Sequence, residues 1–201
     1  FAETTEPGGC ENSFTIVRRW TATDLCGNST EHWQHITVQD TEAPVLVGLP
    51  TETNVTGDCT DDLPVIPTVT ATDNCAAPID VEFSETITPG DCANSYTITR
   101  SWSAEDACGN ATSFVQTIAI DDTEAPVLVG LPTETNITGD CTDDLPVIPT
   151  VTATDNCTAS IDVEFSETIT PGDCANSYTI TRTWSAEDAC GNATSFVQTI
   201  A

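Results

Sequence analysis

The sequence predicts an all-β protein made of tandem β-sandwich domains that are joined end to end and stapled by disulfides. The chain repeats itself with a shift of 82 positions, and laying residues 41–119 on residues 123–201 leaves only four differences. Short stretches rich in Thr and Val alternate with period two between Pro, Gly, Asn and Asp, and no window keeps the spacing of an amphipathic helix. Four cysteines recur in each repeat, which favours disulfides in a small unit poor in apolar residues.

The period sets the expected domain organisation. Units of a solenoid run roughly 20–50 residues, so a longer period indicates tandem domains. We expect the C-terminal half of one repeat over residues 1–39, a complete repeat over residues 40–121, and a second repeat over residues 122–201 that lacks its last few residues.

Within the complete repeat, each expected strand lies between turn or breaker residues. Pro50 ends the first strand, Gly57 and Asp58 follow the second, and Pro64 and Pro67 confine the start of the third to a sheet edge or a bend. About seven short strands with regular turns are typical of an immunoglobulin-like sandwich. The clearest strands are expected at residues 44–49, 52–56, 63–72, 79–87, 96–105 and 112–120.

One arginine interrupts the apolar face of the strand over residues 96–105. Arg100 lies between Ile98 and Trp102 on that face. A buried guanidinium must be paired with a carboxylate or stacked on an aromatic ring, so we expect a structural role; an anion-binding role is the alternative. The structural residues expected from the three copies are Arg18, Trp20, Arg100, Trp102, Arg182 and Trp184.

The charge balance excludes two classes of partner. The chain has 32 acidic residues and a formal net charge of −28, with four Arg and no Lys. Such a chain repels nucleic acids and anionic membrane surfaces. No stretch approaches the roughly 18 apolar residues that indicate a transmembrane helix. We therefore expect no nucleic-acid partner and no membrane insertion of this segment.

The residues around the last two strands match a known family. The run Tyr96–Asn110 resembles the end of a HYR-like (hyalin-type) repeat, and Gln116–Pro126 resembles its junction with the next repeat; Ala71–Cys75 also fits. The chain resembles the four-cysteine variety found in giant cell-surface proteins of Bacteroidetes-type bacteria, including gliding-motility adhesins. The resemblance implies an immunoglobulin-like sandwich, export to the cell surface, and an adhesive or stalk role.

Strand length restricts the disulfide pairing. A ten-residue strand covers roughly 30 Å, whereas disulfide-bonded Cα atoms lie within about 7 Å, which argues against pairing the two cysteines that flank it. In an immunoglobulin-type sandwich, two parallel strands in opposite sheets would bring their starts together and their ends together. This predicts the pairs Cys59–Cys92, Cys75–Cys108, Cys141–Cys174 and Cys157–Cys190, which leaves Cys10 and Cys26 without partners in this chain. Sequential pairing, which would join Cys10 to Cys26, remains the alternative.

Acidic residues are expected to gather where one repeat meets the next. Carboxylates follow the two long strands at the end where the chain enters each domain, and such oxygen-rich groups suit calcium. Capping of tight turns by Asp and Asn is the alternative interpretation. The candidate calcium ligands are Asp40, Glu42, Asp73, Asn74, Asp106 and Asn110 in one repeat, and Asp121, Asp122, Glu124, Asp155, Asn156, Asp188 and Asn192 in the next.

No arrangement of residues indicates an enzyme. The two histidines, His32 and His35, fall on opposite faces of a strand and occur in one copy only. We expect a non-enzymatic stalk that presents a binding tip, with neighbouring repeats and other subunits of a surface machinery as partners. The alternatives are a multivalent adhesin whose repeats bind glycans or surfaces directly, and a filament of laterally packed repeats.

Overall fold

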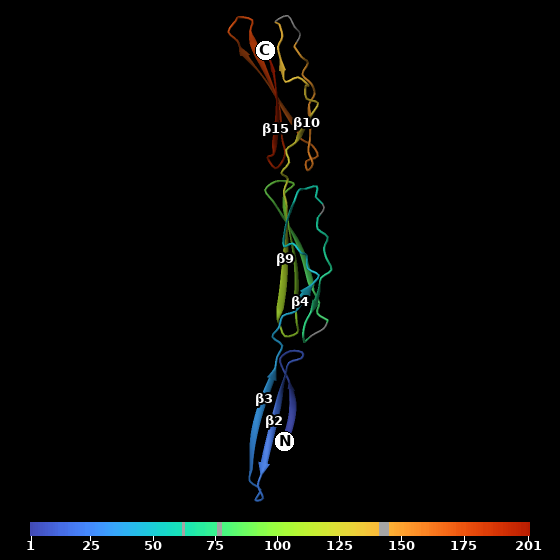
Figure 1. Cartoon of the computed structure of the whole chain (residues 1–201), viewed down its shortest axis with the longest axis vertical. Helices are drawn as coiled ribbons and strands as arrows, with labels where there is room; N and C mark the ends of the chain where they lie inside the picture. Colours follow the sequence, from blue (N-terminus) through green and yellow to red (C-terminus); the bar gives the residue numbers. More distant parts are fainter. Residues whose placement is uncertain (62, 76–77, 141–144) are drawn as a thin grey trace. The chain divides into compact units, whose positions relative to one another are not determined.

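The computed structural model describes residues 1–61, 63–75, 78–140 and 145–201 (Figure 1). Every regular element assigned within these ranges is a β-strand. The all-β class predicted from period-two patterning is therefore confirmed. In the same ranges, no helix has the length and apolar character needed to cross a bilayer.

The chain forms two compact units whose limits differ from those of the sequence repeats. The first contains Phe1–Thr53, Pro64–Thr86 and Thr99–Thr117, and the second contains Asn54–Leu63, Ile87–Ile98 and Ile118–Ala201. Residues 40–121, expected as one repeat, contribute to both. Each unit thus combines residues from consecutive sequence repeats.

In the last repeat, a four-stranded sheet has the order β11-β15-β14-β13 and a two-stranded sheet pairs β10 with β12. The central strands β13, β14 and β15 form an antiparallel meander, while β11 runs parallel to β15. A bridge between Ala153 and Ile161 adds to the smaller sheet. The strands are β10 (Val127–Val129), β11 (Asn136–Ile137), β12 (Thr152–Thr154), β13 (Val163–Pro171), β14 (Tyr178–Glu187) and β15 (Ala193–Ile200).

The preceding strands repeat this plan. Their sheets have the orders β5-β9-β8-β7 and β4-β6, and the first three strands form a sheet of their own in the order β1-β2-β3. These strands are β1 (Ala2–Pro7), β2 (Phe14–Thr23), β3 (Ser29–Val38), β4 (Val45–Val47), β5 (Asn54–Gly57), β6 (Thr70–Thr72), β7 (Glu82–Pro89), β8 (Tyr96–Glu105) and β9 (Ala111–Ile120).

The strand expected over residues 63–72 is much shorter than predicted. Only Thr70–Thr72 pairs as β6, with β4. Pro64 and Pro67 lack the N–H that a sheet ladder requires. The irregular segment instead offers the carbonyl oxygen of Pro64 to the Arg100 guanidinium at 2.7 Å.

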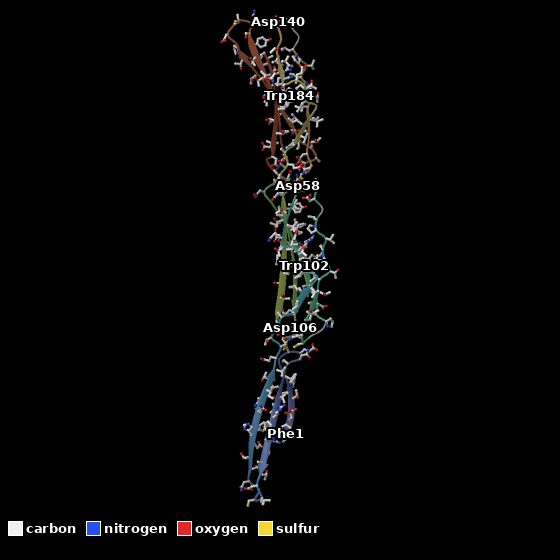
Figure 2. The ribbon with its side chains drawn as sticks, viewed as in Figure 1. Phe1, Asp58, Trp102, Asp106, Asp140 and Trp184 are labelled. Carbon is white, nitrogen blue, oxygen red and sulfur yellow. A yellow bond between two sulfur atoms is a disulfide. The ribbon has the colours of Figure 1, made fainter. Side chains whose placement is uncertain are left out.

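Alternating residues of the central strands form the core. In β8, Ile98, Trp102 and Ala104 are buried, and Ile118 and Ile120 of β9 are buried as well. Trp102 and Trp184, both labelled in Figure 2, are each 2% exposed and each contact a neighbouring Phe ring. Trp102 and Trp184 therefore belong to the core, whereas their counterpart Trp20 in β2 is 40% exposed.

Candidate functional site at the repeat junction

Every disulfide among the described residues joins one repeat to the next. The pairs are Cys10–Cys108, Cys59–Cys157 and Cys92–Cys190, each with a sequence separation of 98. The first pair lies within the first compact unit and the other two lie within the second. Cys26, Cys75 and Cys174 are free among the described cysteines.

The predicted pairing within a repeat was wrong. Cys59–Cys92, Cys75–Cys108 and Cys157–Cys190 do not form, and Cys10 has a partner after all. The sequential alternative is wrong for Cys10 and Cys26 as well. The prediction Cys141–Cys174 includes Cys141, which lies outside the described residues.

The short linker between two repeats, Asp121 and Asp122, explains why cysteines of different repeats lie close together. The backbone N–H of Asp121, the last residue of the repeat over residues 40–121, donates to the Gly57 carbonyl of that repeat at 3.1 Å. One residue later, the Asp122 carbonyl accepts from the Asn192 side chain of the following repeat at 3.0 Å. Adjacent residues therefore hold the loops of two repeats against each other, within disulfide distance.

Two of the predicted calcium ligands cap a turn. The Asp188 carboxylate accepts hydrogen bonds from the backbone N–H groups of Cys190 and Asn192 and from the Asn192 side chain, at 2.8–2.9 Å. Burial alone would raise the pKa of Asp188, but these bonds from Asn192, Cys190 and Gly191 outweigh it and lower the pKa. Gly191 adopts the left-handed φ of 86° that closes this turn. The capping interpretation therefore accounts for Asp188 and Asn192.

Asp122 has the opposite environment. It is 5% exposed, and neither carboxylate oxygen has a hydrogen-bond partner among the described residues. The backbone N–H of Glu124 approaches this carboxylate without meeting hydrogen-bond geometry. Burial first, then the charges of Asp155, Asp188 and Asp58, raise the pKa of Asp122.

Asp155 provides another buried carboxylate oxygen that has no hydrogen-bond partner among the described residues. Its Oδ1 accepts from the backbone N–H groups of Cys157 and Thr158, both at 2.9 Å, but its Oδ2 is buried without a partner. One oxygen each of Asp122 and Asp155 lies within 4.8 Å of the other, and the same holds for Asp122 and Asp188. We call Asp58, Asp122, Asp155 and Asp188 the junction carboxylates.

Sequence reasoning missed Asp58, which is labelled in Figure 2. It belongs to the preceding repeat, and its Oδ1 accepts from the Asn156 side chain at 2.7 Å. The cross-repeat disulfide between its neighbour Cys59 and Cys157 holds it beside this group. Because the expected pairing kept Cys59 within its own repeat, no sequence signal indicated Asp58.

Several of the predicted calcium ligands do not belong to the junction carboxylates. Asp121 accepts from the Ser95 hydroxyl at 2.5 Å, and Asn156 donates to Asp58. Glu124 is exposed, as are its counterpart Glu42 and the candidate Asn74.

The earlier junction has a reduced version of the site. One ligand atom each of Asp40, Asp73 and Cys75 lies within 4.8 Å of the others. Asp106 and Asn110 cap their turn as Asp188 and Asn192 do, and Asn110 donates to the Asp40 carbonyl at 3.3 Å. The position one period before Asp58 precedes the start of this sequence. Partial desolvation, then the charges of Asp40 and Asp73, raise the pKa of the free Cys75 thiol.

The repeated arginines pair with carboxylates. Arg100 is 4% exposed and its Nε donates to Glu85 at 2.7 Å; Arg182 donates to Glu167 at 2.8 Å. Arg18, in β2, donates to Glu3 at 2.7 Å but is more exposed. Each buried guanidinium also reaches a proline carbonyl, so it is neutralised and hydrogen-bonded where it lies.

Comparisons with known proteins identify the repeats. A family profile described as "HYR-like domain with 4 cysteines" matches residues 47–120 and 129–201. No curated protein sequence matches the chain.

Two solved structures are similar at low identity. Drosophila N-cadherin EC1-4 is 12% identical over 97% of this chain, with a TM-score of 0.27. Protocadherin gamma C5 EC1-3 is 7% identical over 100% of this chain and 76% of its own, with a TM-score of 0.28. The chain spans 59% of the length of the N-cadherin structure. At these TM-scores the likeness carries no argument about function.

Proposed function

Because the chain belongs to the family of HYR-like domains with four cysteines, we propose that it is a non-enzymatic stalk segment of a large exported surface adhesin. Its repeats, which we place at residues 40–121 and 122–201, hold a binding tip away from the cell. Other subunits of a bacterial surface machinery, such as one for gliding, are the partners that the resemblance suggests.

One observation carries this proposal: the described disulfides connect consecutive repeats. A domain that works alone gains stability from a disulfide that closes a loop within it. A disulfide to the next repeat also restrains that repeat relative to the first. Such a restraint suits a stalk, which must hold its tip in place and bear force. Direct binding by each repeat has less support, because the Trp102 and Trp184 side chains are buried.

Arrays of two, four and eight repeats test the stalk. We expect the radius of gyration from X-ray scattering to rise almost in proportion to the number of repeats. A compact assembly would follow a power of about 0.38 in residue number instead. Growth of that compact kind would refute the stalk. Clear binding of an isolated two-repeat segment on a glycan array would favour the multivalent adhesin.

We also propose that the junction carboxylates hold a calcium ion. Asp122 supports this directly: its carboxylate is nine-tenths buried and has no hydrogen-bond donor among the described residues. A carboxylate in such surroundings needs either a proton or a cation. The chain has no Lys, and its four Arg lie at positions 18, 19, 100 and 182, none of them among the junction residues. Carboxylate oxygens are the ligands that calcium prefers, and flexible geometry with added water suits it.

In this proposal Asp122 and the unpartnered Oδ2 of Asp155 are the ligands, and Asp58 and Asp188 add negative charge. The site would contain residues of both repeats, since Asp58 belongs to residues 40–121 and the other three belong to residues 122–201. Binding would therefore strengthen the same junction that the disulfides close.

Asp122→Asn tests the calcium site, with Asp121→Asn as the matched control. Both changes remove one charge, but Asp121 faces Ser95 and its replacement keeps an acceptor there. We expect calcium to raise the melting temperature of the parent and of Asp121→Asn, and to leave Asp122→Asn unchanged. At free calcium a thousandfold above Kd, the gain is about 4 kcal/mol.

Titration calorimetry of the same three proteins measures the stoichiometry. No melting shift between calcium and EDTA in the parent would overturn the proposal. So would a calcium response of Asp122→Asn equal to that of the control.

A further inference from the structure

The disulfides form interleaved loops. Each sequence separation of 98 equals one period of the repeat plus sixteen. Sixteen residues is also the spacing between Cys92 and Cys108 along the chain. A second disulfide therefore begins sixteen residues before the point where the first one ends.

This arrangement creates a short covalent route through the chain. From Phe1, nine residues lead to Cys10, and a disulfide crosses to Cys108. Sixteen residues lead back to Cys92, a second disulfide crosses to Cys190, and eleven residues remain to Ala201. The route uses thirty-six backbone steps of the two hundred in the chain.

The connecting segment is already extended in the folded protein. The sixteen backbone steps from Cys92 to Cys108 include β8, a ten-residue strand. A strand rises about 3.3 Å per residue, close to the limit of a fully extended chain. The route therefore has little slack, and pulling on it transfers tension to the disulfides early.

We propose that the disulfides and β8 form a covalent load path that bypasses most of each repeat. Tension applied to the ends is then carried from disulfide to strand to disulfide, and an unfolded repeat releases almost no additional length. In a continued array, each period of the repeat adds sixteen residues and one disulfide to this path. The load path gives the stalk proposed above a means of keeping its length under force, and its biological use rests on that proposal.

Single-molecule pulling on handles at both termini tests the load path. At roughly 3.5 Å per residue, the fully unfolded oxidised chain should stop at about 130 Å plus two disulfides, and the reduced chain at about 700 Å. In the double variant Cys92→Ser/Cys190→Ser, the shortest covalent route must run through one of the remaining disulfides. Its route is about 102 residues, so it should stop at about 360 Å.

Cys59→Ser/Cys157→Ser is the matched control. It also removes one disulfide of the same loop length, but that disulfide is not on the shortest route. The limit of this control should therefore stay at about 130 Å. The length of an unfolded chain does not depend on stability, so a destabilised variant gives an equally clear result. An oxidised parent that extends as far as the Cys92→Ser/Cys190→Ser variant would overturn the load path, as would equal lengthening in both double variants.

Failure of the stalk proposal would be visible separately. Repeats that bind glycans, or arrays that grow as compact bodies, would leave the measured limit of the unfolded chain unchanged. A long limit in a rod-shaped array would refute only the load path.

Discussion

Two aspartates of the same junction show how strongly local donors decide the role of a residue. Asp188 accepts three side-chain hydrogen bonds at the turn after β14, whereas the Asp122 carboxylate accepts none from the residues that the structure describes. Hydrogen bonds to the ionised form lower the pKa of Asp188, and burial beside other carboxylates raises the pKa of Asp122. The first residue is complete as a turn cap, whereas the environment of the second supports the proposed cation site.

The turn caps predict a loss of stability in acid. The Asp106 carboxylate accepts from the backbone N–H groups of Cys108 and Asn110 and from the Asn110 side chain. Burial opposes ionisation, yet these bonds lower the pKa of Asp106 below its usual 3.8. Its contribution is therefore present above the unfolded pKa and is lost as the pH falls through the folded pKa.

We expect the stability advantage of the parent over Asp106→Asn to shrink as the pH falls below about 4. Urea midpoints at several pH values between 6 and 2.5 measure it. Asp80→Asn, which also removes one carboxylate but at an exposed position, is the control for the change in net charge. An advantage over Asp106→Asn that persists or grows in acid would contradict this role.

At the residue scale, the sequence identified the cap and the arginine positions but did not separate caps from ligands. Asp106 and Asp188 stand in the same Asp-x-x-Gly-Asn pattern, from which a turn could be read. The unsatisfied state of Asp122 depends on burial between two repeats. Spacing along one repeat contains no information about that burial.

Among the elements, the central strand of each four-stranded sheet positions the buried ion pair. Period-two alternation along β14 buries Ile180, Arg182, Trp184 and Ala186 on one face. The neighbouring strand β13 places Glu167 opposite Arg182 in the register. The Arg182 guanidinium therefore pairs with the Glu167 carboxylate on the adjacent strand, directly opposite it.

Arg182→Met should destabilise the protein by about 2–3 kcal/mol, because Pro146 and Glu167 both lose a donor. Glu167→Gln keeps an acceptor and should cost about 1 kcal/mol. Urea unfolding under oxidising conditions measures both.

The control is Arg19→Met, because the Arg19 side chain is 45% exposed and pairs loosely with Glu31 at 3.5 Å. It should change stability by less than about 1 kcal/mol. An Arg182→Met effect as small as that of the control would show that the buried pair contributes little.

The strands were predictable to the extent that alternation specifies them. The strand expected over residues 96–105 matches β8 because apolar and polar residues alternate throughout it. The stretch 63–72 is similarly apolar, but most of it does not pair in the sheet. Its prolines lack a backbone N–H, and the Pro64 carbonyl accepts a hydrogen bond from Arg100. Composition alone could not predict that a carbonyl of this stretch would bond to a guanidinium distant in the sequence and not to a neighbouring strand.

For the whole molecule, the period was readable but its covalent connections were not. Sequence reasoning assumed that each repeat closes its own disulfides, as an isolated small domain must. The structure pairs cysteines of consecutive repeats because the linker residues Asp121 and Asp122 bond to loops on either side. A pairing of this kind depends on contacts between copies, which are invisible in the pattern of a single copy.

Interleaved disulfides also change what a protease can do to this chain. Every peptide bond between Cys10 and Cys190 lies inside at least one disulfide loop. A single cut there opens a loop but leaves both pieces covalently attached. All aspartates of the chain lie between Cys10 and Cys190. After cleavage limited to a single cut per molecule with an aspartate-specific protease, we expect one band of undiminished mass on a non-reducing gel and fragments only after reduction. Separation of fragments without reductant would contradict the pairing. Retention means that a single cut leaves the chain in one covalent piece.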